Sequence, residues 1–209
     1  TKHVLVMERI HGIPVDKVDK LKELGYDMNE IGQKLAENFV KQILDDAFFH
    51  ADPHPGNIWI MDGKIAWLDF GMMGKLTGRD KELFRSAVTA IVNNDIYQLK
   101  NVFLTLGTAK QPIDHALLYT DVDEMVSRYG NLELGNMNLG VVFQEFMHVA
   151  NKHHILLPQS VTMLGRGVMT IEGVLRFCAP DINLLQILAT HMSNEFFRNL
   201  DWNKELKRT

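Results

Sequence analysis

The sequence has 209 residues, of which 46% are apolar and 23% charged, as expected of a globular protein with one substantial domain. The net charge is −4 without a basic tract, which argues against nucleic-acid binding, and no run of about 18 apolar residues could span a bilayer. The only cysteine, Cys178, excludes an internal disulfide and suits a reducing compartment such as the cytoplasm.

The first segment, His3 to Val15, begins with a Val-rich apolar run and is broken by Gly12 and Pro14. We therefore expect a short strand followed by a turn. Asn29 can cap a helix that runs to about Phe48. The apolar residues of this helix recur every four positions and form one buried stripe. They are Ile31, Leu35, Phe39, Ile43 and Ala47.

A β-hairpin is predicted by Asp62-Gly63, a strong signal for a two-residue turn. Its strands are expected over residues 58–61 and 64–68. With a two-residue turn, Met61 pairs with Lys64, and Asn57 faces Leu68. The spacing therefore predicts that Asn57 and Asp69 leave the open end of the hairpin side by side.

From Thr77 onward the pattern is helical, and Thr77 with Asp80 has the spacing of a variant capping box. Further helices are expected over residues 95–106, 114–128, 140–153, 158–177 and 182–200, with a loop at 130–140. An apolar stripe on the 158–177 helix favours core packing over a lipid-facing groove. Its members are Val161, Leu164, Val168, Ile171 and Leu175.

The last predicted helix, 182–200, is amphipathic. It carries Leu188, Met192, Phe196 and Phe197, and is followed by Trp202 and several basic residues. We expect it to dock on the rest of the chain, with attachment to a membrane surface as the alternative.

The segment FFHADPHPGN, residues 48–57, carries the densest chemistry in the chain, and three interpretations apply to it. In the first, His50, Asp52 and His54 alternate as H-x-D-x-H, share one face of an extended segment and bind zinc or iron in a hydrolase. In the second, the prolines and glycine form only a turn, and the histidines satisfy backbone groups.

The third interpretation is phosphoryl transfer. His50, Asp52 and Asn57 have the H-x-D-x-x-x-x-N spacing of a kinase catalytic loop, and Asp69-Phe70-Gly71 follows after the hairpin. Phosphoryl transfer needs a carboxylate near the nucleophile and hard oxygen ligands for Mg²⁺ close by. The predicted hairpin supplies both ligands, from Asn57 and Asp69. Together these motifs favour this interpretation over the other two.

The motifs HADPHPGN, LDFGMMG and VLVMERIHGIPV resemble those of the UbiB/AarF family of atypical kinase-like proteins, and the resemblance covers nearly the whole chain. It implies a mainly α (α+β) fold, the C-terminal lobe of a protein kinase with a small β-hairpin and a helical extension. Residues 1–15 would hold the hinge strand and the start of the lobe. Residues 16–110 would form the kinase-like lobe, and residues 111–209 the helical extension.

The resemblance also implies roles for individual residues. Asp52 becomes the catalytic aspartate, and His50 braces the loop by hydrogen bonding. His54 stands where protein kinases often carry a phosphate-facing lysine, so it either contacts phosphate or is purely architectural. Asn57 and Asp69 become the Mg²⁺ ligands. The residues expected to lie against the nucleotide are Met7, Glu8, Arg9 and Ile10 at the adenine edge, and Gly56, Phe70 and Gly71 near the loop.

The same resemblance implies that the chain forms half of an ATP cleft. The hinge lies near residue 7, so the smaller lobe, with its phosphate loop and strand lysine, is expected upstream as the partner of this lobe. Without that lobe we expect the chain to be inactive. Few residues separate Gly71 from the helix near Arg79, which favours a small or lipid-like phosphate acceptor over a peptide.

The family resemblance further implies a role in making ubiquinone-like isoprenoid quinones. A lipid or quinone-precursor ligand and a membrane surface are the partners it implies, with a cytoplasmic location that is peripheral to the membrane or anchored in it by other segments. The alternative is a pseudokinase scaffold that binds ATP and Mg²⁺ without transferring phosphate.

Overall fold

The computed structural model describes residues 3–4, 6–129 and 132–194. This part of the chain is mainly helical with three small antiparallel sheets, the α+β class expected. The helices are α1 (Val18–Glu23), α2 (Met28–Leu44), α3 (Gly78–Val92), α4 (Ile96–Leu106), α5 (His115–Tyr129), α6 (Leu139–Lys152) and α7 (Gln159–Cys178), and residues 184–194 are also helical. The strands are β1 (Ile13–Pro14), β2 (Phe48–His50), β3 (Ile58–Met61), β4 (Lys64–Trp67), β5 (Met73–Lys75), β6 (Thr108–Ala109) and β7 (Ile155–Leu156), with 3₁₀ turns at Pro55–Asn57 and Leu134–Asn136.

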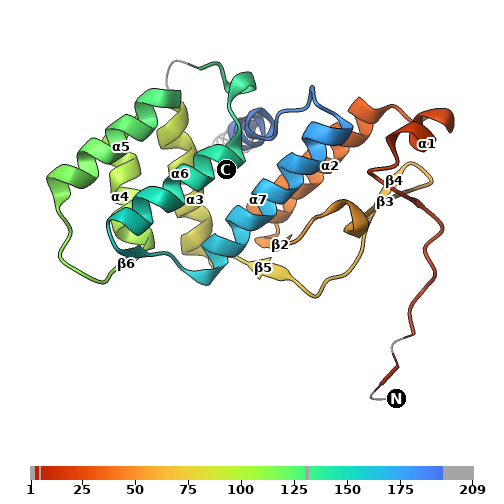
Figure 1. Cartoon of the computed structure of the whole chain (residues 1–209), viewed down its shortest axis with the longest axis horizontal. Helices are drawn as coiled ribbons and strands as arrows, with labels where there is room; N and C mark the ends of the chain where they lie inside the picture. Colours follow the sequence, from red (N-terminus) through yellow and green to blue (C-terminus); the bar gives the residue numbers. More distant parts are fainter. Residues whose placement is uncertain (1–2, 5, 130–131, 195–209) are drawn as a thin grey trace, which may run out of the picture.

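The two longest of these helices, α2 and α7, pack against each other in the middle of the molecule (Figure 1). Helices α3 to α6 lie on one side of this pair, and the β3–β4 hairpin lies on the other. One continuous hydrophobic core joins the two sides. Of the described helices, none is both long enough and apolar enough to cross a membrane.

Helix α2 differs from its prediction at both ends. The N-cap is Asp27, whose carboxylate accepts the backbone N–H of Asn29 at 2.8 Å, so the predicted cap at Asn29 was wrong. The helix ends at Leu44 rather than Phe48, and Ala47 has a left-handed φ of 50° that turns the chain into β2. The predicted stripe is buried from Ile31 to Ile43.

The hairpin has the predicted register. Met61 pairs with Lys64 and Ile58 with Trp67, and the N–H of Leu68 donates to the carbonyl of Asn57 at 2.9 Å. Asp62 and Gly63 both have positive φ, as a type I′ turn requires. Strand β4 ends at Trp67, one residue before the predicted end.

The opening strand was misplaced by sequence analysis. Residues 3–4 and 6–12 form no strand, and β1 covers Ile13–Pro14, where we expected the turn. This strand is antiparallel to β3, with Ile13 opposite Ile60. The position of the strand is therefore set by its pairing with the hairpin, and not by the β propensity of the Val-rich run that precedes it.

The helices after the hairpin lie within two residues of their predicted starts. The capping box is present: the N–H of Asp80 donates to Thr77 Oγ1 at 3.1 Å, and the N–H of Thr77 donates to Asp80 Oδ2 at 3.2 Å. The predicted stripe of α7 is buried from Val161 to Leu175. The predicted last helix is present over 184–194, while its remaining residues, including Phe196 and Phe197, and Trp202 beyond it lie outside the described residues.

A sheet that we did not predict, formed by β2 and β5, connects the two sequence motifs that we predicted to form the site. Phe49 of β2 lies opposite Gly74 of β5 and is fully buried. A Cβ on residue 74 would overlap the Phe49 ring, so the pairing requires glycine at that position. The sheet holds the start of the HADPHPGN loop (residues 50–57) beside the segment that follows Gly71.

Candidate functional site

The HADPHPGN loop runs from β2 through the 3₁₀ turn into β3. Pro55 stands at the first position of this turn, where a missing N–H costs no hydrogen bond. His54 precedes it as the N-cap, and its Nδ1 accepts the N–H of Gly56 at 3.1 Å. The His54 side chain is otherwise exposed, so its observed contact is local and architectural. A contact between His54 and phosphate stays a prediction, as does the nucleotide contact of Gly56.

His50 braces the loop through both ring nitrogens, and only 1% of its surface is exposed. Nδ1 accepts the N–H of Asp52 at 3.2 Å, which assigns the proton to Nε2. Nε2 then donates to the carbonyl of Leu68 at 3.0 Å, and the ring stacks on Trp67 with centroids 5.7 Å apart. These are the bracing contacts that we predicted for His50, and they leave no ring nitrogen for a metal ion.

Asn57 is held by the same loop. Its Nδ2 donates to the carbonyl of Asp52 at 3.1 Å, and only 7% of the residue is exposed. This bond fixes the orientation of the amide, and no described residue donates to Oδ1. Because Leu68 is hydrogen-bonded to Asn57, the next residue, Asp69, begins beside it at the open end of the hairpin.

Asp69 adopts a left-handed backbone conformation with φ of 53°, which is uncommon for residues other than glycine but is adopted more readily by Asn, Asp and His than by most. Its Oδ1 accepts the N–H of Gly71 at 3.1 Å, and the other carboxylate oxygen has no donor in the described chain. Asn57 and Asp69 thus each present one unoccupied oxygen atom. Hard oxygen ligands of this kind fit Mg²⁺, so the residues present are compatible with the predicted metal.

Phe70 lies next to this turn and is 62% exposed. Its ring centroid is 6.1 Å from that of His50, so it borders the braced part of the loop. Gly71 has a tight position as well, because a Cβ there would lie 3.0 Å from Asp69 Oδ1. The nucleotide contacts of Phe70 and Gly71 stay predictions.

Asp52 has a partner that the sequence did not reveal. One of its carboxylate oxygens lies 3.6 Å from the guanidinium of Arg166, which belongs to α7. The two residues are far apart in the sequence, and no motif of the sequence links them. The sole local signal is the pair of glycines that flank it, Gly165 and Gly167.

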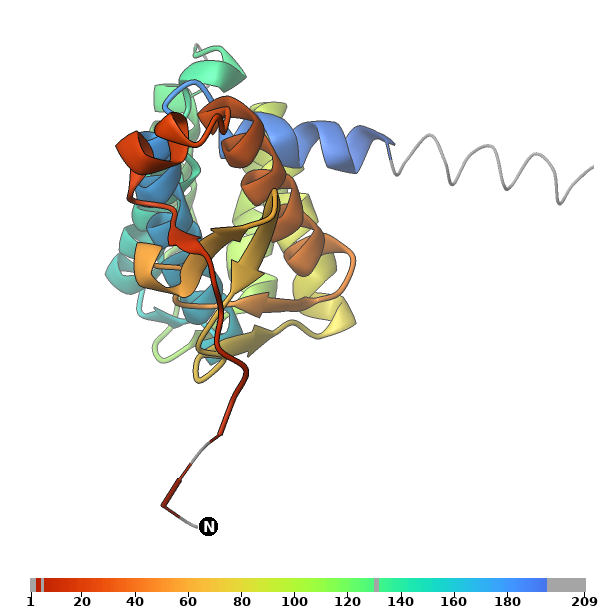
Figure 2. The same cartoon turned by 90° about the vertical axis from the view of Figure 1, so that its right-hand side faces the viewer.

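The residues predicted for the adenine edge are not brought to the loop. Met7 is 68% exposed, Glu8 and Arg9 are exposed, and Ile10 is half-buried. Figure 2 shows that this N-terminal segment projects away from the lobe beyond β1. A role of these four residues in nucleotide binding stays a prediction.

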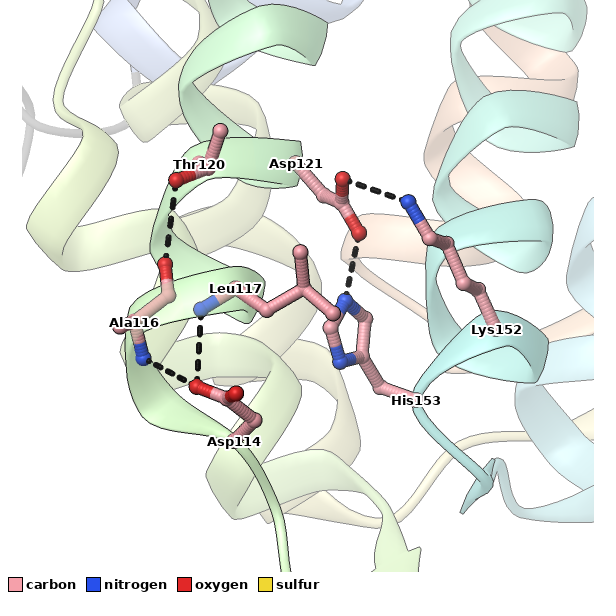
Figure 3. A network of polar contacts seen from close by, with 7 residues as sticks. All are labelled: Asp114, Ala116, Leu117, Thr120, Asp121, Lys152 and His153. Carbon is pink, nitrogen blue, oxygen red and sulfur yellow. Dashed lines mark hydrogen bonds and ion pairs between the residues drawn. The ribbon is translucent and has the colours of Figure 1, made fainter.

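The alternative His-Asp-His metal centre is not formed. The nitrogens of His50 are both occupied, and the described residues contain no group of three or more His, Cys, Asp or Glu side chains arranged to hold a metal ion. His153, which is followed by a second histidine in the sequence, lies in another polar network with Asp121 and Lys152, between α5 and α6 (Figure 3). Its neighbour His154 is exposed.

Two family models match the chain. The ABC1 atypical kinase-like domain matches residues 1–103, and the UbiB helical domain matches residues 122–183.

Curated proteins are similar to the chain over most of its length. It is 33% identical over 99% of its length to an uncharacterized protein from the 5′ region of hydrogenase 1 in Clostridium pasteurianum, and covers 40% of that protein. It is 30% identical over 88% of its length to a probable protein kinase UbiB of Shewanella woodyi and to the chloroplastic protein ACTIVITY OF BC1 COMPLEX KINASE 1 of Arabidopsis thaliana, and covers 34% and 27% of them. The chain therefore spans less than half the length of these relatives.

Proposed function

Because this chain belongs to the ABC1/UbiB family of atypical kinase-like proteins, we propose that the HADPHPGN loop and Asp69 form its Mg-ATP site. The family membership supports a kinase-like activity in general. The residues of the site support the more specific proposal, since they combine a carboxylate, Asp52, with two unoccupied oxygen ligands, on Asn57 and Asp69.

The orientation of Asn57 is the observation that carries the proposal. Its amide nitrogen is used by the Asp52 carbonyl, so its oxygen is the atom left for a cation. The β-hairpin and its Leu68–Asn57 hydrogen bond then set Asp69 beside it. Only 7% of Asn57 is exposed, but its oxygen atom is not among the buried side-chain atoms of the described residues that lack a partner, so it stays accessible from solvent to a cation.

Each residue has a defined task in this proposal. Asp52 accepts the proton of a hydroxyl group or water whose oxygen attacks the terminal phosphorus of ATP. The bond from phosphorus to the bridging oxygen breaks, and ADP leaves with the electron pair. Asn57 and Asp69 hold Mg²⁺, which when bound neutralises charge on the phosphate oxygens. His50 keeps the loop in place through the hydrogen bonds of its two ring nitrogens.

The proposed acceptor is a small or lipid-like molecule, and the proposed process is the synthesis of isoprenoid quinones. Similarity to a protein named UbiB supports this process. Strand β5 and helix α3 follow closely after Gly71, which leaves little chain to hold a peptide substrate. A smaller lobe that closes over the nucleotide and a membrane surface that delivers the acceptor are the partners of this proposal.

Titration with ATP of the longer protein, in which this chain is joined to the proposed smaller lobe, with and without Mg²⁺, tests the proposal. We expect binding that requires Mg²⁺ and is lost in Asp69→Asn and Asn57→Ala. Asp62→Asn, at the far end of the same hairpin, is the matched control and should bind as the wild type does. Failure of the wild type to bind Mg-ATP at about 1 mM, the upper end of ordinary affinities, contradicts the proposal, as does unchanged binding by Asp69→Asn. ATP turnover by the binding-competent protein then separates an enzyme from a nucleotide-binding scaffold.

A further inference from the structure

We propose that Arg166 of α7 is a phosphate-binding residue of this site, which supplies the positive charge that the HADPHPGN loop lacks. The inference rests on the proposed Mg-ATP function and adds a residue to it. It begins from the 3.6 Å contact between the Arg166 guanidinium and the Asp52 carboxylate.

The loop has no lysine or arginine of its own. Two residues after Asp52 stands His54, whose Nδ1 accepts a hydrogen bond from the N–H of Gly56 and is thus directed at the backbone of its own loop. The site contains two carboxylates, on Asp52 and Asp69. Arg166 is a cationic side chain that pairs with the first of them, Asp52. A triphosphate adds negative charge at this place, and Arg166 offsets it.

Helix α7 packs closely against the loop at the position of Arg166. A Cβ on Gly167 would lie 3.1 Å from the carbonyl oxygen of His50 and 3.3 Å from the Phe39 ring, so the helix approaches the loop closely at this point. A Cβ on Gly165 would overlap the ring of Phe143 on α6. Both neighbours of Arg166 are thus glycines at close contacts, and the arginine between them reaches Asp52 from a fixed helix.

The Asp52–Arg166 contact is loose enough to rearrange. Its 3.6 Å separation exceeds the roughly 2.7–2.9 Å of a charge-assisted hydrogen bond, and the Arg166 side chain is 55% exposed. A guanidinium carries five N–H donors in a planar fork that matches phosphate oxygens. Arg166 therefore pairs with Asp52 before the nucleotide binds, and turns to the terminal phosphate afterwards.

The test compares the affinities for ATP and ADP by titration calorimetry in the presence of Mg²⁺. Arg166→Met should weaken ATP binding by about 10- to 100-fold, the range for hydrogen bonds to charged groups, while ADP binding changes by less than about 2-fold. Arg166→Lys, which keeps the charge, should recover part of the loss. Arg176→Met is the matched control, because Arg176 lies about 15 Å further along the same helix at 1.5 Å per residue.

The outcomes separate this inference from the proposed function. Equal losses for ATP and ADP, or no loss for either, overturn the role of Arg166 even though Asp69→Asn still abolishes Mg-ATP binding. A wild type that binds neither nucleotide overturns both. Urea unfolding of each variant shows whether a loss of nucleotide affinity comes from a protein that is no longer folded. If Arg166→Met is unfolded, Arg166→Gln is used instead, and its affinities for ATP and ADP are compared with those of the wild type in the same way.

Discussion

The imidazole of His50 donates a hydrogen bond to the carbonyl of Leu68 at 3.0 Å, and this bond ties the proposed catalytic loop to the residue that precedes Asp69. The N–H of Ala51 reinforces the tie by donating to the carbonyl of Met72 at 2.9 Å. The loop and the turn that carries Asp69 are therefore fixed to each other on both sides of Asp69, even though Asp69 itself is exposed.

Replacing His50 by phenylalanine should destabilise the protein and weaken Mg-ATP binding together. Phenylalanine keeps the ring but leaves the Leu68 carbonyl and the Asp52 N–H without partners, which should lower the free energy of unfolding by about 1–3 kcal/mol. Urea denaturation measures this change. His148→Phe, on the exposed face of α6, should stay within about 0.5 kcal/mol of the wild type. Equal effects of the two substitutions would contradict the bracing role.

Glu172 should be one of the most sensitive positions in the helical part. It is buried in α7, and its two carboxylate oxygens accept the N–H groups of Leu139 and Gly140 at 2.8 and 2.7 Å, at the start of α6. Glu172→Ala leaves both buried groups without a partner and should cost about 2–4 kcal/mol. Glu172→Gln keeps one acceptor oxygen, so its free energy of unfolding should lie between those of the wild type and Glu172→Ala. Glu124→Ala, on the surface of α5, is the control, and an equal cost there would refute the assignment.

The network in Figure 3 predicts a pH dependence of stability. Burial by itself raises the pKa of Asp121, but hydrogen bonds from Lys152 and His153, each at 2.7 Å, outweigh it and lower that pKa. A carboxyl whose pKa is lower in the folded state than the unfolded value of about 3.9 stabilises the fold above that pH. This contribution is lost as the pH falls through the folded pKa.

Asp121→Asn removes the titrating group. The stability difference between wild type and Asp121→Asn should be largest near neutral pH and should shrink below about pH 4. Urea unfolding of both proteins across this range measures the difference. A gap that stays constant or widens in acid would show that the pKa of Asp121 is not lowered by folding.

Two glycines of α7 should respond to alanine in opposite directions. Gly165→Ala places a methyl group against the buried Phe143 ring and should cost about 1–3 kcal/mol. Gly173→Ala meets no atom within 4 Å and should stabilise the helix by about 0.5–1 kcal/mol, because alanine loses less backbone entropy. Thermal or urea unfolding of Gly165→Ala and Gly173→Ala, each compared with the wild type, measures the two changes in stability. The same sign for both would show that α7 is not packed on α6 as described.

The parts of the site that depend on local sequence were predictable. A two-residue turn at Asp62-Gly63 sets the register of the hairpin, and the register sets Asn57 beside Asp69. The β2–β5 sheet was missed, because three-residue strands carry little periodicity and Gly74 disfavours a strand. Its pairing depends on the buried Phe49 ring, a tertiary contact. The cap at Asp27 was missed because Asn29, two residues later, is also a good N-cap residue.

Arg166 could not be assigned from the sequence for a different reason. Its partner Asp52 lies on a loop that precedes the hairpin, and only the packing of α7 against that loop brings the two together. A lone arginine between two glycines has no characteristic spacing to any motif. In the folded chain, Gly165 and Gly167 make close contacts that position Arg166, and these contacts cannot be read from the tripeptide alone.

The pairing of Asp52 with Arg166 also bears on how such proteins can be recombined. Asp52 lies in the segment matched by the kinase-like family model, and Arg166 lies in the segment matched by the helical one. A chimaera that joins the kinase-like part of one relative to the helical part of another therefore exchanges half of an ion pair at the proposed nucleotide site. Such hybrids should retain the proposed site only when the incoming helix carries an arginine between two glycines, as at residues 165–167 of this chain.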